Sequence, residues 1–97
     1  MRLIGGPELQ MLTRGADPEL RGAALALAAE LRAASWRSPG EARQAFPRAE
    51  CTDDRLTVFL DDRHCAVVLI SYEKGVALIE FAGPSAGRPA TGAAGKA

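Results

Sequence analysis

The sequence predicts an α+β domain in which N-terminal helices pack on one face of a three- to four-stranded antiparallel sheet. Two observations predict this class. The first half of the chain has apolar residues at helical spacing behind helix-start signals, and the second half has strand-length apolar runs separated by short polar turns. With 97 residues, 47% of them hydrophobic and 25% charged, the chain has the composition of one globular domain, expected over residues 1–83.

The first elements are a short strand and two helices. Residues 2–4 form a strand candidate that a Gly pair ends, and Pro7 is suited to the first turn of a helix through about residue 13. Asp17 is an N-cap acceptor followed by Pro18, which predicts a second helix to about Ala34. This helix has an apolar stripe at helical spacing, formed by Leu20, Ala24, Leu27 and Leu31.

A third helix and a sheet are expected after it. Ser38 and Glu41 form a capping box, and Pro47 ends the short helix that the box starts. Trp36 is expected to be buried where the second and third helices meet the sheet. The β pattern then predicts three strands in a meander of hairpins, at residues 56–60, 65–72 and 76–81. A further edge strand is expected at residues 49–51.

Charge and composition limit which functions and locations the sequence supports. The 12 basic residues equal the 12 acidic ones, so net charge gives no argument for nucleic-acid binding. Arg greatly outnumbers Lys, which suits phosphate contacts and is equally explained by a GC-rich coding bias. The start of the chain lacks a signal-peptide pattern and no apolar run is of membrane-spanning length, so a cytoplasmic location is expected. Residues 84–97 are expected to form a disordered Gly/Ala/Pro-rich tail.

Several chemical sites are disfavoured by geometry. His64 and Cys65 are adjacent on a strand, so their side chains point to opposite faces and do not form a nucleophile pair. Cys51 and Cys65 are expected to be free thiols, and no metal-ligand spacing is present, so no metal or cofactor is expected. The pairs Asp53-Asp54 and Asp61-Asp62 lie at opposite ends of a strand, which predicts solvated turn carboxylates.

A set of spaced landmarks resembles the HigB-type toxins of the RelE-like superfamily, bacterial mRNA interferases encoded beside an antitoxin. The likeness covers residues 1–83 and implies a RelE-like fold. Those toxins continue with Thr-His-x-x-Tyr-Asp, whereas here Ser85 stands at the His position, and Arg88 and Pro89 stand at Tyr-Asp. The landmarks are Trp36-Arg37-Ser38-Pro39, Ala45-Phe46-Pro47, Asp54-Arg55, Tyr72 and Phe81-Ala82-Gly83.

The resemblance also implies site residues. Ribonucleases of this superfamily make the 2'-hydroxyl of the RNA attack the adjacent phosphate, which needs proton-transfer groups and cations. Arg63 keeps the charge of a family Lys and His64 replaces a family Tyr, so both are the predicted catalytic residues. Arg55, Arg63 and Lys74 are the predicted RNA-binding residues. The alternative interpretation is that these four residues, which lie at or near strand ends, only keep the turns and sheet edges soluble.

Two functions from different classes follow. The first is a HigB-like toxin module of a type II toxin-antitoxin system, an endoribonuclease by descent that acts on mRNA at the ribosome. Its partner would be a small helix-turn-helix antitoxin. The alternative is a catalytically degenerate binding or homo-oligomerisation module that keeps the antitoxin-binding surface. The missing C-terminal motif and the zero net charge favour the alternative, and the scaffold likeness favours the toxin.

Overall fold

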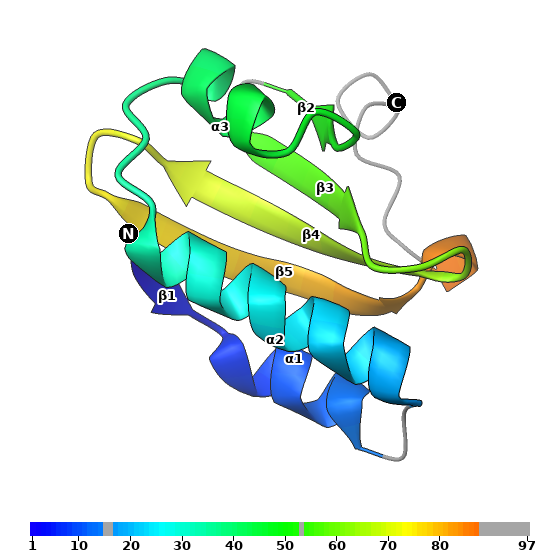
Figure 1. Ribbon diagram of the computed structural model, residues 1–97. Coiled ribbons are helices and arrows are strands. Elements are labelled where there is room, and N and C mark those ends of the chain that lie inside the picture. Colours follow the sequence, from blue (N-terminus) through cyan, green and yellow to red (C-terminus); the bar gives the residue numbers. More distant parts are fainter. Residues whose placement is uncertain (15–16, 53, 88–97) are drawn as a thin grey trace.

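The structure is a computed structural model that describes residues 1–14, 17–52 and 54–87. Helices lie on one side of a mixed β-sheet (Figure 1), which confirms the α+β class. The elements in chain order are β1 (Arg2–Ile4), α1 (Gly6–Thr13), α2 (Pro18–Ala33), α3 (Pro39–Ala45), β2 (Glu50–Cys51), β3 (Arg55–Phe59), β4 (His64–Ser71), β5 (Val76–Pro84) and the 3-10 helix η1 (Ser85–Gly87).

The sheet has five strands in the order β1-β5-β4-β3-β2. The strands from β2 to β5 pair antiparallel, as expected, but β1 pairs parallel with β5, with Arg2 opposite Val76. The expectation of a purely antiparallel sheet of three to four strands is therefore wrong. The sequence indicates that residues 2–4 are extended, but a strand of three residues carries no pattern that identifies its partner.

Local signals fix where the helices begin. The Asp17 carboxylate accepts a hydrogen bond from the backbone N–H of Leu20 at 2.8 Å, and the Ser38 hydroxyl accepts one from the backbone N–H of Glu41 at 3.4 Å. The Glu41 carboxylate in turn accepts from the backbone N–H of Arg37 at 3.0 Å. Each bond satisfies an amide that has no partner within its helix. The predicted starts of α2 and α3 are confirmed.

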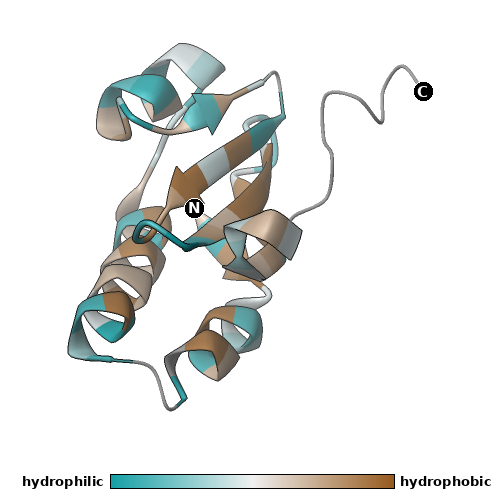
Figure 2. Cartoon of the chain, turned by 90° about the vertical axis from the view of Figure 1, so that its right-hand side faces the viewer, coloured by the Kyte–Doolittle hydropathy of each residue, from teal (hydrophilic) through white to brown (hydrophobic). Residues whose placement is uncertain are grey.

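The core lies between the helices and one face of the sheet. The predicted apolar stripe of α2 is buried, and its Leu27 and Leu31 pack with Leu9 of α1 against the strands. Hydrophobic colouring runs along the central strands in Figure 2. The core cluster takes its strand residues from alternate positions of β3, β4 and β5, namely Leu56, Ala66, Val68, Ile70, Ala77 and Ile79.

Trp36 packs at the margin of this core. Its indole meets the ring of Phe46 edge-on, with ring centroids 5.8 Å apart and planes at 83°. It is partly buried and packs against the core cluster, so the predicted burial is confirmed in part. The residue lies in the connection between α2 and α3.

Near the N-terminus Gly5 lies against β5, and near the other end of the described chain β5 is longer than the sequence predicts. Gly5 links β1 to α1 with φ of 87°, and a Cβ at this position would lie 3.0 Å from the carbonyl oxygen of Ile79. At the other end, β5 reaches Pro84 and η1 continues to Gly87, so ordered elements pass the predicted boundary at residue 83. The rest of the predicted tail, residues 88–97, lies outside the described residues.

Candidate functional site

The turn between β3 and β4 is built around the carboxylate of Asp61. Its Oδ1 accepts hydrogen bonds from the backbone N–H groups of Arg63 at 2.7 Å and His64 at 2.8 Å. These bonds close a turn of the kind that Asp side chains favour. Together with the His64 ring, they lower the pKa of Asp61, and the Arg63 N–H makes the largest contribution. The carboxylate is therefore ionised throughout the neutral range.

The His64 ring is held by the same carboxylate. Its Nδ1 lies 3.0 Å from Oδ1 and 3.2 Å from Oδ2 of Asp61. Because an ionised carboxylate only accepts hydrogen bonds, Nδ1 is the protonated nitrogen and donates to it. In the neutral ring Nε2 is then the basic nitrogen. No partner for Nε2 is found among the described residues, and the side chain is 27% exposed.

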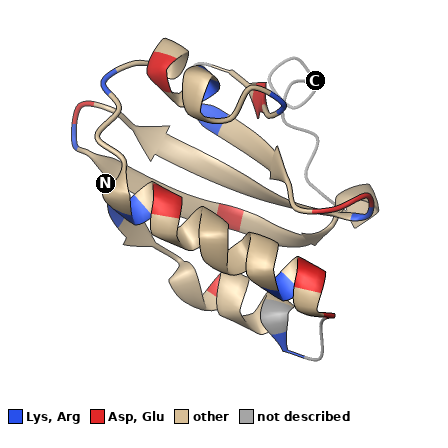
Figure 3. Ribbon diagram, viewed as in Figure 1, with Lys and Arg blue, Asp and Glu red and all other residues tan. Residues whose placement is uncertain are grey.

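Asp61 lies in a turn, as predicted, but its carboxylate also has partners within the chain. Its side chain is only 25% exposed and makes all the contacts just described, whereas the adjacent Asp62 is exposed. Figure 3 shows acidic and basic segments together in this turn. Sequence reasoning missed the Asp61 and His64 pair, although a separation of three residues across a turn was a signal that could have found it.

The C-terminal end of β5 lies against this turn, beside η1 (Figure 1). Pro84 pairs with His64 in the β4 and β5 ladder, and the backbone N–H of Ser85 donates to the carbonyl of Arg63 at 2.7 Å. The Ser85 hydroxyl oxygen is buried and has no hydrogen-bond partner in the described part of the chain. A hydroxyl with unused hydrogen-bonding capacity thus lies in the same corner as His64.

The four residues of the predicted cluster separate into two groups. Arg63 and His64 lie at this corner, with the Arg63 side chain exposed. Arg55 pairs with Leu69, five positions along β4 from His64, or about 17 Å at a rise of about 3.3 Å per residue. Lys74 lies beyond Ser71, in the turn that leads into β5. The structure therefore does not bring the four residues together.

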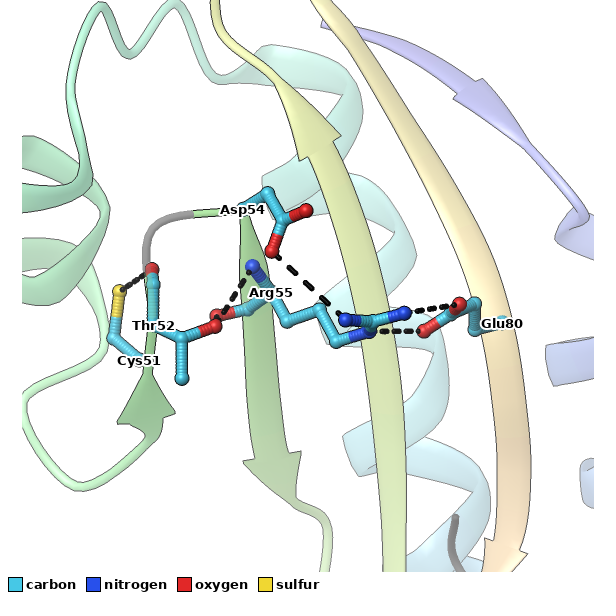
Figure 4. A network of polar contacts seen from close by, with 5 residues as sticks. All are labelled: Cys51, Thr52, Asp54, Arg55 and Glu80. Atoms are coloured by element: carbon cyan, nitrogen blue, oxygen red, sulfur yellow. Dashed lines mark hydrogen bonds and ion pairs between the residues drawn. The ribbon is translucent and has the colours of Figure 1, made fainter. Parts of the chain in front are cut away.

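Arg55 is engaged with Glu80 across β4 (Figure 4). Its Nε lies 2.8 Å from Oε1 and its Nη2 lies 3.2 Å from Oε2, a bidentate pair. The guanidinium lowers the pKa of Glu80, chiefly through these hydrogen bonds. A register shift in β5 between the partners of Val67 and Val68 leaves Glu80 outside the ladder. The charge of Arg55 is thus offset within the sheet.

A groove of about 540 Å³ runs beside the same turn. One wall follows α3 and the other is the end of β3, so the groove shares Asp61 with the His64 corner. Sequence reasoning missed the groove and its cation, Arg48, because no spacing in the chain indicates which loop faces the end of β3. The lining residues are Ala45, Phe46, Pro47, Arg48, Ala49, Val58, Phe59, Leu60, Asp61 and Asp62.

Metal-ligand types do not gather in the described residues, where no group of three or more His, Cys, Asp or Glu side chains is placed to hold an ion. Cys51 and Cys65 are free thiols, as predicted, and Cys65 is fully buried. Within the described ranges, no helix has the length and apolar composition needed to cross a bilayer.

A scan against models of protein families finds no match to this chain, and a search of curated proteins finds none either. The resemblance to HigB-type toxins therefore depends on the landmark residues of the sequence.

Proposed function

We propose that this chain is a HigB-like toxin module of a type II toxin-antitoxin pair, with His64 as the proton-transfer residue of an mRNA-cleaving site. The observation that carries the proposal is the contact of His64 Nδ1 with the Asp61 carboxylate at 3.0 Å. A carboxylate in this position fixes the tautomer and leaves Nε2 as the nitrogen that can accept a proton. His64 is the only His in the chain.

The proposed reaction is an internal phosphoryl transfer. Nε2 of His64 takes the proton of the RNA 2'-hydroxyl, and the 2'-oxygen forms a bond to the adjacent phosphorus as the bond from phosphorus to the 5'-oxygen breaks. The imidazolium then gives its proton to the leaving 5'-oxygen. The products are a 2',3'-cyclic phosphate and a 5'-hydroxyl end. This sequence balances in protons and electrons without a metal or a cofactor.

Arg63 is the proposed phosphate-binding cation. It is next to His64 in the chain, its side chain is exposed, and its backbone is held at both ends by Asp61 and Ser85. A guanidinium beside the scissile phosphate would stabilise the charge that develops on the phosphate oxygens. Lys74 and Arg55 lie at the other end of the sheet, so in this proposal they do not act on that phosphate.

The scaffold and partners form the rest of the proposal. Helices on one face of a sheet of five strands are compatible with a RelE-like fold, and the landmark residues support that fold. The proposed substrate is mRNA at the ribosome in the cytoplasm, and the proposed partner is a small helix-turn-helix antitoxin. These assignments rest on the family resemblance.

A second candidate is a binding or oligomerisation module without activity. It is favoured by the Arg55 and Glu80 pair, which offsets a cation that the resemblance places in the RNA site. It is also favoured by a shallow, mostly apolar groove of about 390 Å³ on the sheet, where Ile4 is 44% exposed. That groove is lined by Ile4, Asp54, Leu69, Ile70, Ser71, Val76 and Leu78.

Expression in a bacterium separates the two candidates. Expressed alone, the wild type should arrest growth, and His64→Ala should relieve the arrest. Lys74→Ala is the control, because it removes an exposed cation far from the corner and should leave the arrest intact. A wild type that is harmless at a confirmed expression level contradicts the toxin proposal and leaves the binding module.

A further inference from the structure

The face of the sheet that points away from the α-helices carries apolar side chains. A row of cross-strand partners runs over it, namely Ile4, Leu78, Leu69 and Arg55. These residues alternate along their strands with residues of the core cluster, so they point away from the helices in Figure 1. Ile4 is 44% exposed, Leu69 and Leu78 are half-buried, and the three line the shallow groove of about 390 Å³. The described residues thus leave apolar surface on this face that a partner would bury.

An ion pair crosses the middle of this face. The Arg55 guanidinium holds the Glu80 carboxylate by two contacts, at 2.8 and 3.2 Å. In Figure 4 the two side chains meet in front of β4, with a helix behind the sheet. Arg55 belongs to β3 and Glu80 to β5, which are the neighbours of β4 on either side. Positive and negative charges therefore originate on opposite sides of one central strand.

This arrangement is complementary to itself. Consider two copies stacked face to face, with a two-fold axis along β4 midway between them. Such an axis carries the β3 side of one copy over the β5 side of the other. Arg55 of each copy then lies opposite Glu80 of the other, and Leu69 of β4 lies opposite its own counterpart. Because each ion pair is already bidentate within its own copy, its burial leaves little charge uncompensated.

The size of the face suits a small, reversible interface. β4 and β5 have eight and nine residues, so the face is about 28 Å long at a rise of about 3.3 Å per residue. Five strands about 4.8 Å apart make it about 24 Å wide, although β1 and β2 are short. A contact of roughly 500 Å² per copy belongs to the low end of specific interfaces, where dissociation constants are on the order of micromolar.

The charges of this face disfavour a nucleic acid as its partner. Glu80 offsets the charge of Arg55, and the side chain of Asp54, which is 60% exposed, adds a carboxylate to the groove. Both carboxylates repel phosphate, and phosphate contacts supply most of the non-specific affinity for nucleic acids. A surface with equal and opposite charges across β4 instead matches a second copy of itself.

We infer that this face is the interface of a homodimer whose two-fold axis runs along β4. The inference does not depend on the proposed RNA cleavage. His64 lies on the same side of the sheet as the core residue Ala66, two positions along β4, so the partner copy does not cover it. The dimer therefore carries two His64 corners on its outer sides.

Analytical ultracentrifugation of the full chain, across the micromolar range, tests the dimer. The wild type should show a reversible equilibrium between monomer and dimer. Leu69→Asp places two carboxylates against each other on the axis and should raise the dissociation constant by about 30-fold or more. Leu25→Asp is the matched control, because Leu25 is 57% exposed on α2, and it should leave the equilibrium unchanged. Circular dichroism confirms that each variant is folded.

Charge reversal tests the axis itself. Glu80→Arg and Arg55→Glu each place like charges opposite one another in a dimer of identical copies, so each variant alone should be monomeric. An equal mixture of the two variants should dimerise, because every cation then meets a carboxylate of the other copy. If these variants fail to fold, the wild type still provides a test. Upon dilution its amide NMR signals at Leu69 and Leu78 should shift, and those of α2 should not.

Three results would overturn the inference. A wild type that is monomeric throughout this range would mean that another segment or another protein occupies the face. A dimer that Leu69→Asp leaves intact, or amide shifts confined to α2, would place the interface elsewhere. A mixture of the charge variants that stays monomeric would contradict the two-fold axis along β4. Cleavage of mRNA is measured separately, and its presence or absence leaves these results unaffected.

Discussion

Nδ1 of His64 lies 3.0 Å from Oδ1 of Asp61, and the same oxygen accepts the backbone N–H groups of residues 63 and 64. One carboxylate therefore shapes the turn and orients the only imidazole of the chain. The bonds exist before any substrate binds, so the ring need not be ordered during a reaction. This relationship is the basis of the first prediction and of the last.

The first prediction is that Asp61 stabilises the fold in a pH-dependent way. Its pKa is lowered in the folded chain, so its contribution is fully present above the ordinary Asp pKa of about 3.9 and is lost as pH falls through the lowered value. Asp61→Asn should therefore be less stable than the wild type at pH 7 and closer to it near pH 3. Urea unfolding at both pH values measures the difference. Asp62→Asn is the control, and an equal effect from it would contradict the role of Asp61.

The second prediction concerns two glycines with positive φ. Gly75 has φ of 67° with open space around its Cα, so Gly75→Ala should cost about 1–2 kcal/mol for the backbone conformation alone. Gly5 has φ of 87°, and an added Cβ would lie 3.0 Å from the Ile79 carbonyl oxygen. Gly5→Ala should therefore cost clearly more. Chemical denaturation of both variants gives the comparison, and equal losses would show that β1 does not approach β5 this closely.

The third prediction concerns α2. Leu31 is 0% exposed and Leu25 is 57% exposed on the same helix. Leu31→Ala should lower the free energy of unfolding by about 2–5 kcal/mol, because it leaves a cavity against the sheet. Leu25→Ala should stay within about 0.5 kcal/mol of the wild type. If the two variants unfold at similar denaturant concentrations, α2 packs with a different face.

The fourth prediction is that Arg55 and Glu80 are energetically coupled. A double-mutant cycle with Arg55→Met and Glu80→Gln should show a favourable coupling that weakens at high salt. Because the pKa of Glu80 is lowered, the coupling should persist at pH values above the ordinary Glu pKa and disappear as pH falls through the lowered one. Asp54→Asn is the control, because the Asp54 carboxylate lies 4.0 Å from the Arg55 guanidinium, farther away than the Glu80 carboxylate at 2.8 Å. A coupling near zero at low salt would mean that the pair is formed only transiently.

Local signals in the sequence predicted most of the elements. The N-caps at Asp17 and Ser38 and the Pro residues after them placed two helix starts, because a cap acts within its own turn. Strand-length apolar runs placed β3, β4 and β5 to within a residue or two at most ends. The parallel pairing of β1 was not predicted, because it joins segments more than seventy positions apart in the chain.

The candidate site was predicted less fully than the fold. His64 and Arg63 were identified from a family resemblance, and the structure places them in one corner. Arg55 is separated from them by the register of β3 with β4, which the sequence does not specify. Lys74 is separated from them by the length of β4. The groove beside Asp61 arises where the segment after α3 faces the end of β3, a contact between segments with no shared pattern.

Cleavage of ribosome-bound mRNA by the purified chain, with analysis of the ends it leaves, tests the central claim most directly. The wild type should produce 2',3'-cyclic phosphate and 5'-hydroxyl ends. His64→Ala, with a wild-type melting curve, should cut at least about 10²-fold more slowly. Lys74→Ala should cut at the wild-type rate. A His64→Ala variant that cuts as fast as the wild type, or a folded wild type that does not cut, would contradict the assignment of His64 as the proton-transfer residue.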